Sequence, residues 1–204
     1  MELKAHWEKV YNSKTDTEVS WFQEIPVTSL HLIEGLKLNL SDAIIDIGGG
    51  NSNLIPLLNK KGYHDLTVLD ISGMSLSRVQ RKMGVACKNI NRIESDILEF
   101  MPYKKYKLWH DRATFHFITT VDGKKKYRDQ LINSLDVNGY FILATFSSIG
   151  PNKCSGLDVC QHDIESLSEI FGDSFQLIRD SKEEHITPSG AVQDFIFTVW
   201  KFVK

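Results

Sequence analysis

The stretch "IIDIGGGNSNL", residues 44 to 54, joins an apolar run to three consecutive glycines and then to a polar segment. The apolar run contains one acid, Asp46, and the glycines are Gly48, Gly49 and Gly50. Glycine adopts backbone conformations that other residues avoid, and the first turn of a helix leaves its N–H groups free. A strand that turns through glycine into a helix therefore predicts a ligand site at the bend.

Short β-rich runs alternate with helical patterns from residue 43 onward, which predicts an α/β fold. Continuous apolar strands separated by helices are typical of a parallel sheet that is covered on both faces. The expected strands are residues 43–48, 66–70, 90–96, 105–111 and 139–146, and the expected helices begin near Ser52 and cover 72–84, 125–135 and 163–172.

Both ends of the chain depart from this alternation. Residues 174–185 and 191–203 read as two consecutive strands joined by a short turn at 187–190, and such strands pair antiparallel. Residues 3–38 read as two helices. We therefore expect one domain over residues 1–204, with a helical cap at 1–38 and a doubly wound sheet core at 40–204 that carries an antiparallel C-terminal hairpin.

The bulk composition excludes several classes of partner. The chain has 204 residues and a formal net charge of −2, so it offers no basic surface for nucleic acid. No apolar stretch approaches the roughly 20 residues that cross a bilayer, and the first residues lack the apolar core of a secretory signal, so a cytoplasmic protein is expected. Three cysteines with irregular spacing predict free thiols rather than disulfides.

The glycine bend does not match the common phosphate-binding motifs. Gly48 and Gly50 fit the start of the dinucleotide pattern G-x-G-x-x-G, but Asn53 occupies the third glycine position. No Gly-Lys-Ser/Thr follows, which excludes a phosphate-loop NTPase. A ligand without a pyrophosphate is therefore favoured.

Three acids at or in the strands define a different ligand. Asp70 ends the second strand and can accept hydrogen bonds from both hydroxyls of a ribose, although it could instead cap a helix. Asp46 is costly to bury without donors or a cation. Asp96 ends the third strand and can meet an adenine amino group, with Ile97 against the ring. S-adenosylmethionine, which has an adenine, a ribose and a cationic tail, satisfies all of these positions.

Four motifs, "DIGGGNS", "LDIS" at 69–72, "SDIL" at 95–98 and "NGYFILATF" at 138–146, resemble in order and spacing those of class I S-adenosylmethionine-dependent methyltransferases. The terminal hairpin matches the seventh-strand insertion of that family. The resemblance implies a Rossmann-like seven-stranded sheet of order 3-2-1-4-5-7-6. It also implies an enzyme that moves a methyl group to a small-molecule or protein-lysine acceptor.

A closer likeness covers residues 6–80, which are similar to the protein-lysine methyltransferases of translation elongation factors. It implies that Tyr11 and Trp21, from an N-terminal helix and loop, close over the cofactor. The C-terminal quarter does not match that group. Carried over by position, the residues expected to line the cofactor site are Asp46, Gly48, Gly49, Gly50, Asp70, Ile71, Asp96 and Ile97.

The catalytic candidates follow the fourth strand, whose end lies near the methyl group in this fold. Asp111 could hold the sulfonium or an acceptor amine, and Arg112 could pair with it or bind an acidic substrate. His116 is either a general base, because imidazole titrates near neutral pH, or a packed side chain. His185, before the hairpin turn, is a further candidate for substrate contact.

Two other functions remain open at this point. One is a non-catalytic binding subunit that keeps the fold. The other is methylation of a metalloid by a thiol relay through Cys87, Cys154 and Cys160. Cys154, Cys160 and His162 could also supply three metal ligands, but the compact cysteine pairs of structural zinc sites are absent, so no metal is expected.

Overall fold

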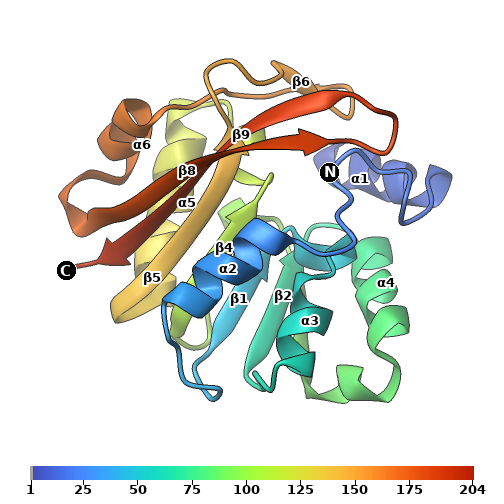
Figure 1. Cartoon of the computed structure of the whole chain (residues 1–204), viewed down its shortest axis with the longest axis horizontal. Helices are drawn as coiled ribbons and strands as arrows, with labels where there is room; N and C mark the ends of the chain where they lie inside the picture. The colour runs from blue at the N-terminus through green and yellow to red at the C-terminus, as the bar shows by residue number, and fades with distance from the viewer. Residues whose placement is uncertain (1) are drawn as a thin grey trace.

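Seven strands form one sheet in the computed structural model, which describes residues 2 to 204 (Figure 1). Their order in space is β3-β2-β1-β4-β5-β9-β8, and β6 and β7 form a separate small ladder. The first five are parallel, whereas β9 is antiparallel to both β5 and β8. The predicted seven-stranded order, with its C-terminal hairpin, is confirmed. The strands are β1 (Ile44–Ile47), β2 (Leu66–Asp70), β3 (Ile90–Glu94), β4 (Tyr106–Arg112), β5 (Leu135–Phe146), β6 (Lys153–Cys154), β7 (Leu157–Asp158), β8 (Phe175–Ile186) and β9 (Val192–Phe202).

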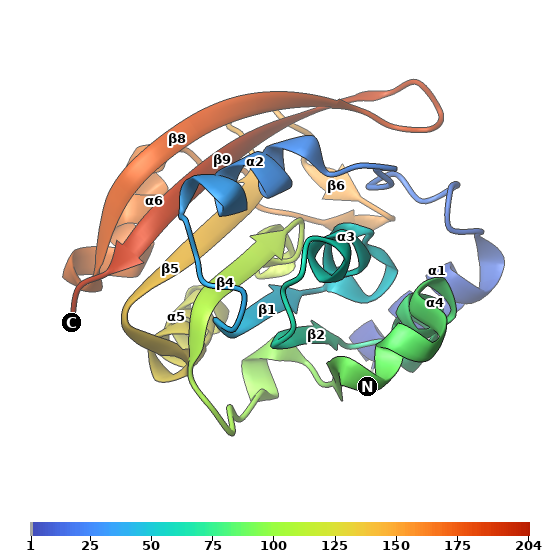
Figure 2. The same ribbon diagram turned by 60° about the horizontal axis from the view of Figure 1, so that its bottom comes forward.

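Helices cover both faces of the sheet (Figures 1 and 2). One apolar cluster joins α2, α3 and α4 to one face, and a second joins α5 and α6 to the other. None of the described helices combines the length and the apolar character that crossing a bilayer requires. The α-helices are α1 (Glu2–Ser13), α2 (Val27–Gly35), α3 (Leu54–Lys60), α4 (Gly73–Met83), α5 (Val121–Ser134) and α6 (Ile164–Phe171), and the short 3-10 helices are η1 (Gly49–Asn51), η2 (Gly84–Asn89), η3 (Ile97–Glu99), η4 (Phe115–Phe117) and η5 (Gly172–Ser174).

Neighbouring side chains of the central strands belong alternately to the two apolar clusters. Leu108 on β4 packs in the cluster with α2 and α3, while its neighbour Trp109 packs in the cluster with α5. Successive side chains of a strand point to opposite faces, so a strand buried on both sides is apolar at most of its positions. The same rule makes any polar residue on β1 or β4 face one cluster or the other.

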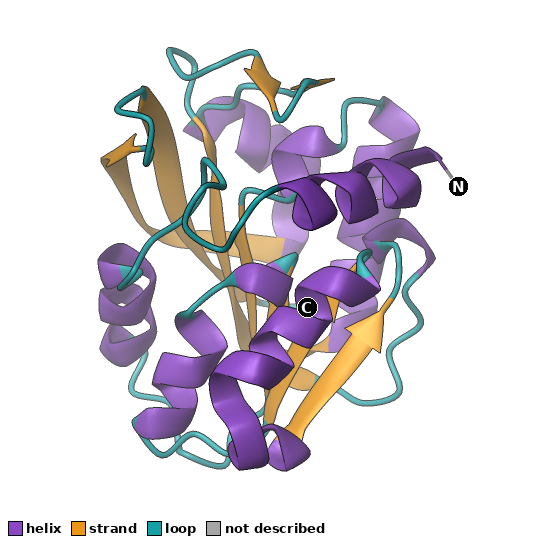
Figure 3. Cartoon of the chain, turned by 90° about the vertical axis from the view of Figure 1, so that its right-hand side faces the viewer, coloured by secondary structure: helices purple, strands orange, loops and turns teal. Residues whose placement is uncertain are grey.

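The N-terminal segment is attached to the sheet by polar contacts. The helix α1, beside the N label in Figure 3, packs against α4. The N–H of Gly73, the first residue of α4, donates to Glu8 Oε1 at 2.8 Å. The buried Arg78 guanidinium pairs with Asp16 at 2.9 Å and donates to the carbonyl oxygens of Tyr11 and Lys14. These contacts hold α1 and the following loop near the carboxyl end of β2.

His116 lies in the packed interior rather than in a position to act as a base. Its side chain is fully buried in η4 and stacks on the ring of Phe146, with ring centroids 4.3 Å apart. Neither ring nitrogen has a hydrogen-bond partner, and burial lowers the pKa of His116 to about 3. The general-base interpretation is therefore corrected, because such a group takes up no proton near neutral pH.

We expect Phe171→Ala to lower the free energy of unfolding by about 3–5 kcal/mol. Phe171 is 1% exposed, and its ring meets those of Phe141 and Trp200 at centroid distances of 5.0 and 5.9 Å. Urea denaturation followed by circular dichroism measures the loss. Ile178→Ala, at a half-exposed position on β8, is the control and should cost less than about 1 kcal/mol. Equal losses in the two variants would contradict the packing described.

His116→Phe should weaken the acid sensitivity of the fold. The unfolded chain has a histidine pKa near 6.5 and the folded chain one of about 3, so the unfolded state gains protons first as the pH falls. The free energy of unfolding then drops by about 2 kcal/mol between pH 7 and pH 5 from this residue alone. Urea denaturation at pH 7 and at pH 5 should show that the free energy of unfolding falls by about 2 kcal/mol less in the variant than in the wild type. The exposed His64→Gln is the control, and an undiminished loss in His116→Phe would refute the assignment.

Candidate functional site

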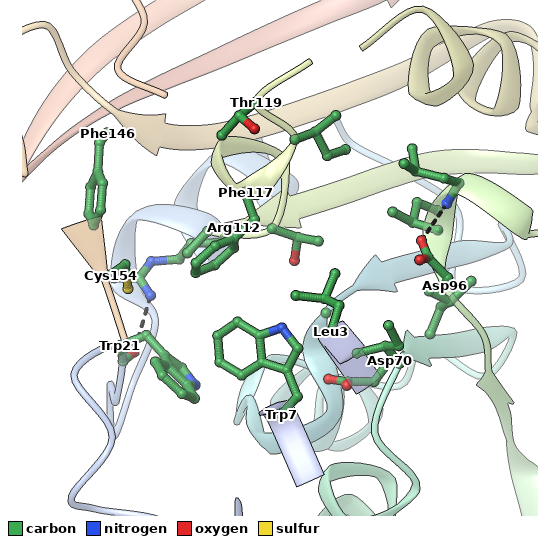
Figure 4. Close-up of a pocket in the computed structure, with 18 of the residues that line it drawn as sticks. Leu3, Trp7, Trp21, Asp70, Asp96, Arg112, Phe117, Thr119, Phe146 and Cys154 are labelled. Atoms are coloured by element: carbon green, nitrogen blue, oxygen red, sulfur yellow. Dashed lines mark hydrogen bonds between the residues drawn. The ribbon is translucent and has the colours of Figure 1, made fainter. Parts of the chain in front are cut away.

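A cavity of about 260 Å³ lies beyond the carboxyl ends of the central strands (Figure 4). Two of its acidic side chains, Asp70 and Asp96, lie together on one side, and Arg112 lies with Phe146 and Cys154 on the other (Figure 4). The N-terminal helix and loop supply part of its wall. The lining residues are Leu3, Trp7, Tyr11, Trp21, Gly48, Leu69, Asp70, Ile71, Ser95, Asp96, Ile97, Leu98, Arg112, Ala113, Thr114, Phe117, Ile118, Thr119, Thr120, Phe146, Cys154, Gln193 and Phe195.

Asp70 is fixed at the tip of β2 by backbone donors. The N–H of Gly50 donates to its Oδ2 at 3.1 Å, and the N–H of Ser72 donates to its Oδ1 at 2.9 Å. The side chain is 4% exposed, and burial raises the pKa of Asp70 to about 6 despite these hydrogen bonds. A Cβ at residue 50 would lie 2.7 Å from Oδ2, so only glycine allows this approach. The result is a rigid, ionisable acceptor beside the cavity.

Asp96 and the residues after it form the neighbouring part of the wall. Asp96 precedes η3, and its Oδ1 accepts the N–H of Leu98 at 2.9 Å. Its side chain is only partly buried, and Ile97 and Leu98 present apolar surface to the same cavity. Ile71, after β2, lines it as well. A flat apolar group would fit between these residues with a carboxylate at its edge.

The glycine bend contributes less of the lining than predicted. Gly48 has φ of 65° and lines the cavity, and its N–H donates to the Leu69 carbonyl at 2.7 Å. A Cβ there would lie 2.0 Å from Thr114 Oγ1. Gly49 and Gly50 are outside the lining, since η1 turns away from the cavity and the Gly50 N–H is used by Asp70.

Asp46 does not line this cavity but borders a smaller neighbouring one, together with Gly49 and Arg112. Alternation on β1 turns it towards α2, where His110 Nδ1 is 2.7 Å from its Oδ1. The other ring nitrogen of His110 is 2.9 Å from Ser29 Oγ. All three residues are at most 2% exposed. One oxygen of the buried Asp46 carboxylate thus has a hydrogen-bond partner, His110, which lies 64 residues further along the chain on β4.

Three aromatic side chains of the N-terminal segment, Trp7, Tyr11 and Trp21, form an aromatic cover over the cavity, and Tyr11 and Trp21 were predicted to do so. Tyr11 and Trp21 line the cavity, with ring centroids 5.9 Å apart. Trp7 lines the cavity as well, and its ring centroid is 5.7 Å from that of Trp21 and 5.1 Å from that of Phe117. Trp7 was not predicted, although its four-residue spacing from Tyr11 places both on one side of α1.

The two candidates at the end of β4 face opposite sides of the sheet. Asp111 is fully buried and accepts the Tyr127 hydroxyl at 2.6 Å and the N–H groups of Thr114 and Phe115 at 2.9 and 3.3 Å. It therefore shapes the loop and does not reach the cavity, which corrects the expectation for it. Arg112, the next residue, does line the cavity.

His185 and the cysteines are dispersed. His185 donates from Nε2 to the Ser20 carbonyl at 2.7 Å, so it holds the N-terminal loop and lies outside the cavity. Of the three cysteines only Cys154 lines the cavity, and Cys160 is half-buried elsewhere. Within residues 2–204 no group of three or more potential ligands is arranged for a metal ion. Phe195 and Gln193 reach the cavity from β9, a contact that no local pattern predicts.

No family model matches the chain, but individual proteins do. It is 27% identical over 86% of its length to malonyl-[acyl-carrier protein] O-methyltransferase 2 of Ilyobacter polytropus, covering 72% of that protein. It is 26% identical over 82% of its length to EEF1A lysine methyltransferase 2 of Mus musculus, covering 73% of it.

Solved structures extend the comparison to the fold. A SAM-dependent methyltransferase from Anabaena variabilis has a TM-score of 0.77 at 17% identity, with 99% of this chain and 96% of that chain covered. The N-methyltransferase NodS from Bradyrhizobium japonicum, in complex with S-adenosyl-L-homocysteine, has a TM-score of 0.68 at 12% identity and coverages of 98% and 99%. The predicted resemblance of this chain to the class I S-adenosylmethionine-dependent methyltransferases is thus confirmed over most of its length.

Proposed function

We propose that the protein transfers a methyl group from S-adenosylmethionine to a small-molecule or protein-lysine acceptor. The observation that carries this proposal is the cavity at the strand tips, with Asp70 and Asp96 on one side and Arg112 on the other. The relatives support it, since one is a malonyl-[acyl-carrier protein] O-methyltransferase and another an EEF1A lysine methyltransferase.

The chemistry of the lining fits this cofactor. Asp70, already oriented by two backbone donors, has the acceptor character that ribose hydroxyls need. Ile71, Ile97 and Leu98 provide apolar contact for an adenine, and Asp96 a carboxylate for its amino group. The lining supplies no cluster of basic side chains for a pyrophosphate. Bound S-adenosylmethionine would supply an electrophilic methyl group on a positively charged sulfur.

The chain itself aligns the two reactants and excludes water from them. Trp7, Tyr11 and Trp21 cover the cavity, and their aromatic faces suit a positively charged neighbour. Holding two reactants in line within such a site can contribute roughly 7–11 kcal/mol to lowering the barrier. With Asp111 and His116 buried elsewhere, neither side chain is placed to take a proton from the acceptor.

Asp70→Asn should weaken binding of S-adenosylhomocysteine by roughly 10- to 100-fold, because it replaces charge-assisted hydrogen bonds to the ribose with neutral ones. Isothermal titration calorimetry measures the dissociation constant. Asp65→Asn is the matched control, because Asp65 is an acid that immediately precedes β2, at the end of the strand opposite Asp70. This substitution should leave the dissociation constant unchanged. An unaltered constant in Asp70→Asn would remove this residue from the site.

Methyl transfer is tested by incubating the protein with methyl-labelled S-adenosylmethionine and, separately, a metabolite extract and a protein extract. We expect S-adenosylhomocysteine to form above the blank, with label in one of the two extracts by mass spectrometry. Failure to bind either form of the cofactor at millimolar concentration would favour the non-catalytic binding subunit instead.

A thiol relay needs several cysteines at the reaction centre, and only Cys154 lines the cavity. We therefore expect Cys87→Ser and Cys160→Ser to leave the rate of S-adenosylhomocysteine formation within about twofold of the wild type. Loss of turnover in either variant, with the fold intact by circular dichroism, would support the thiol relay.

A further inference from the structure

The side of the cavity away from Asp70 and Asp96 is dominated by one cation, Arg112 (Figure 4). If the proposed methyl transfer is correct, this side receives the acceptor. We propose that the acceptor is a small molecule with a carboxylate that binds the Arg112 guanidinium and an apolar, flat body that lies against the aromatic wall.

Arg112 is buried and has unused donors. Its side chain is 10% exposed, and Nη1 donates to the Trp21 carbonyl at 3.1 Å. Its Nε and Nη2 have no hydrogen-bond partner. Burial lowers the pKa of Arg112 to about 10, so the group stays charged at neutral pH. Buried charged donors without partners are costly, and a two-oxygen anion is the ligand that a guanidinium fork fits best.

The nearest acid does not satisfy this arginine. Glu183 Oε1 is 3.8 Å from Arg112 Nη2, which is too far for a hydrogen bond, and the same oxygen accepts the amide of Gln23 at 3.1 Å. Glu183 is also absent from the cavity lining. It lowers the cost of burying the cation but leaves Nε and Nη2 without a hydrogen bond. Both atoms are closed to solvent, so a ligand reaches them only when the Arg112 side chain shifts.

The walls around Arg112 are aromatic. Its guanidinium carbon lies 4.9 Å from the centroid of the Phe195 ring, and that ring is 4.8 Å from the ring of Phe146. Phe117 completes this part of the lining. Aromatic faces favour a flat apolar group through burial and stacking. An aromatic or similarly planar acid therefore matches both the charge and the shape of this side.

The same arrangement disfavours a lysine acceptor. The carboxylates among the lining residues are Asp70 and Asp96, on the other side of the cavity, where the cofactor is proposed to bind. An ammonium group entering beside Arg112 would meet a buried like charge. Arg112 therefore favours a small-molecule acid over a lysine as the acceptor.

The test uses the protein loaded with S-adenosylhomocysteine and three probes of equal size, namely benzoate, benzamide and benzylamine. Calorimetric titration should show benzoate binding about 10- to 100-fold more tightly than either of the others, as expected for hydrogen bonds to a buried charge. Arg112→Gln should abolish this preference, and Arg112→Lys, which keeps the charge but loses the fork, should keep part of it.

The outcomes distinguish this proposal from the proposed function. Arg179→Gln, on an exposed part of β8, is the matched control and should bind benzoate like the wild type. If S-adenosylhomocysteine binds but benzoate does not, or binds no better than benzamide, the anion site is refuted and methyl transfer is untouched. A preference for benzylamine would point to an amine acceptor instead. Failure to bind S-adenosylhomocysteine would refute the proposed function itself.

Discussion

The carboxylate of Asp70, held by the N–H groups of Gly50 and Ser72, is the contact on which the site depends. It joins the tip of β2 to the bend after β1 and to the start of α4. Because burial raises its pKa to about 6, the folded chain keeps an acid there at a real energetic cost. Gly48 of the bend and Gly73, whose N–H binds Glu8 of α1, lie within two residues of these partners.

Much of the fold, and the side of the cavity that carries Asp70 and Asp96, were predictable because their signals are local. Strand periodicity, the glycine bend and acids at strand ends are visible over a few residues and predicted the parallel sheet with its hairpin, whereas the sheet order was implied by the family resemblance. Asp70, Ile71, Asp96 and Ile97 all line one cavity, as the motif spacing suggests.

Other site residues were misplaced for two physical reasons. Side chains of a strand alternate, so Asp111 and Arg112 could not both reach the cavity, and nothing local says which one does. The glycine motif likewise does not reveal that Asp46 turns towards His110. Phe195 and Gln193 reach the cavity only because β9 returns between β5 and β8, a long-range pairing that local sequence does not reveal.

The fastening of the aromatic cover has a consequence for how ligands come and go. Ionised groups make much of that attachment, with the Lys4–Glu94 pair at the rim and the Arg78–Asp16 pair further in. Dissolved ions screen the half-exposed rim pair more strongly than the sheltered one. Raising the ionic strength would therefore weaken the attachment of the first turn of α1, which carries Lys4, before that of the loop after α1. The buried Arg78 would still hold that loop.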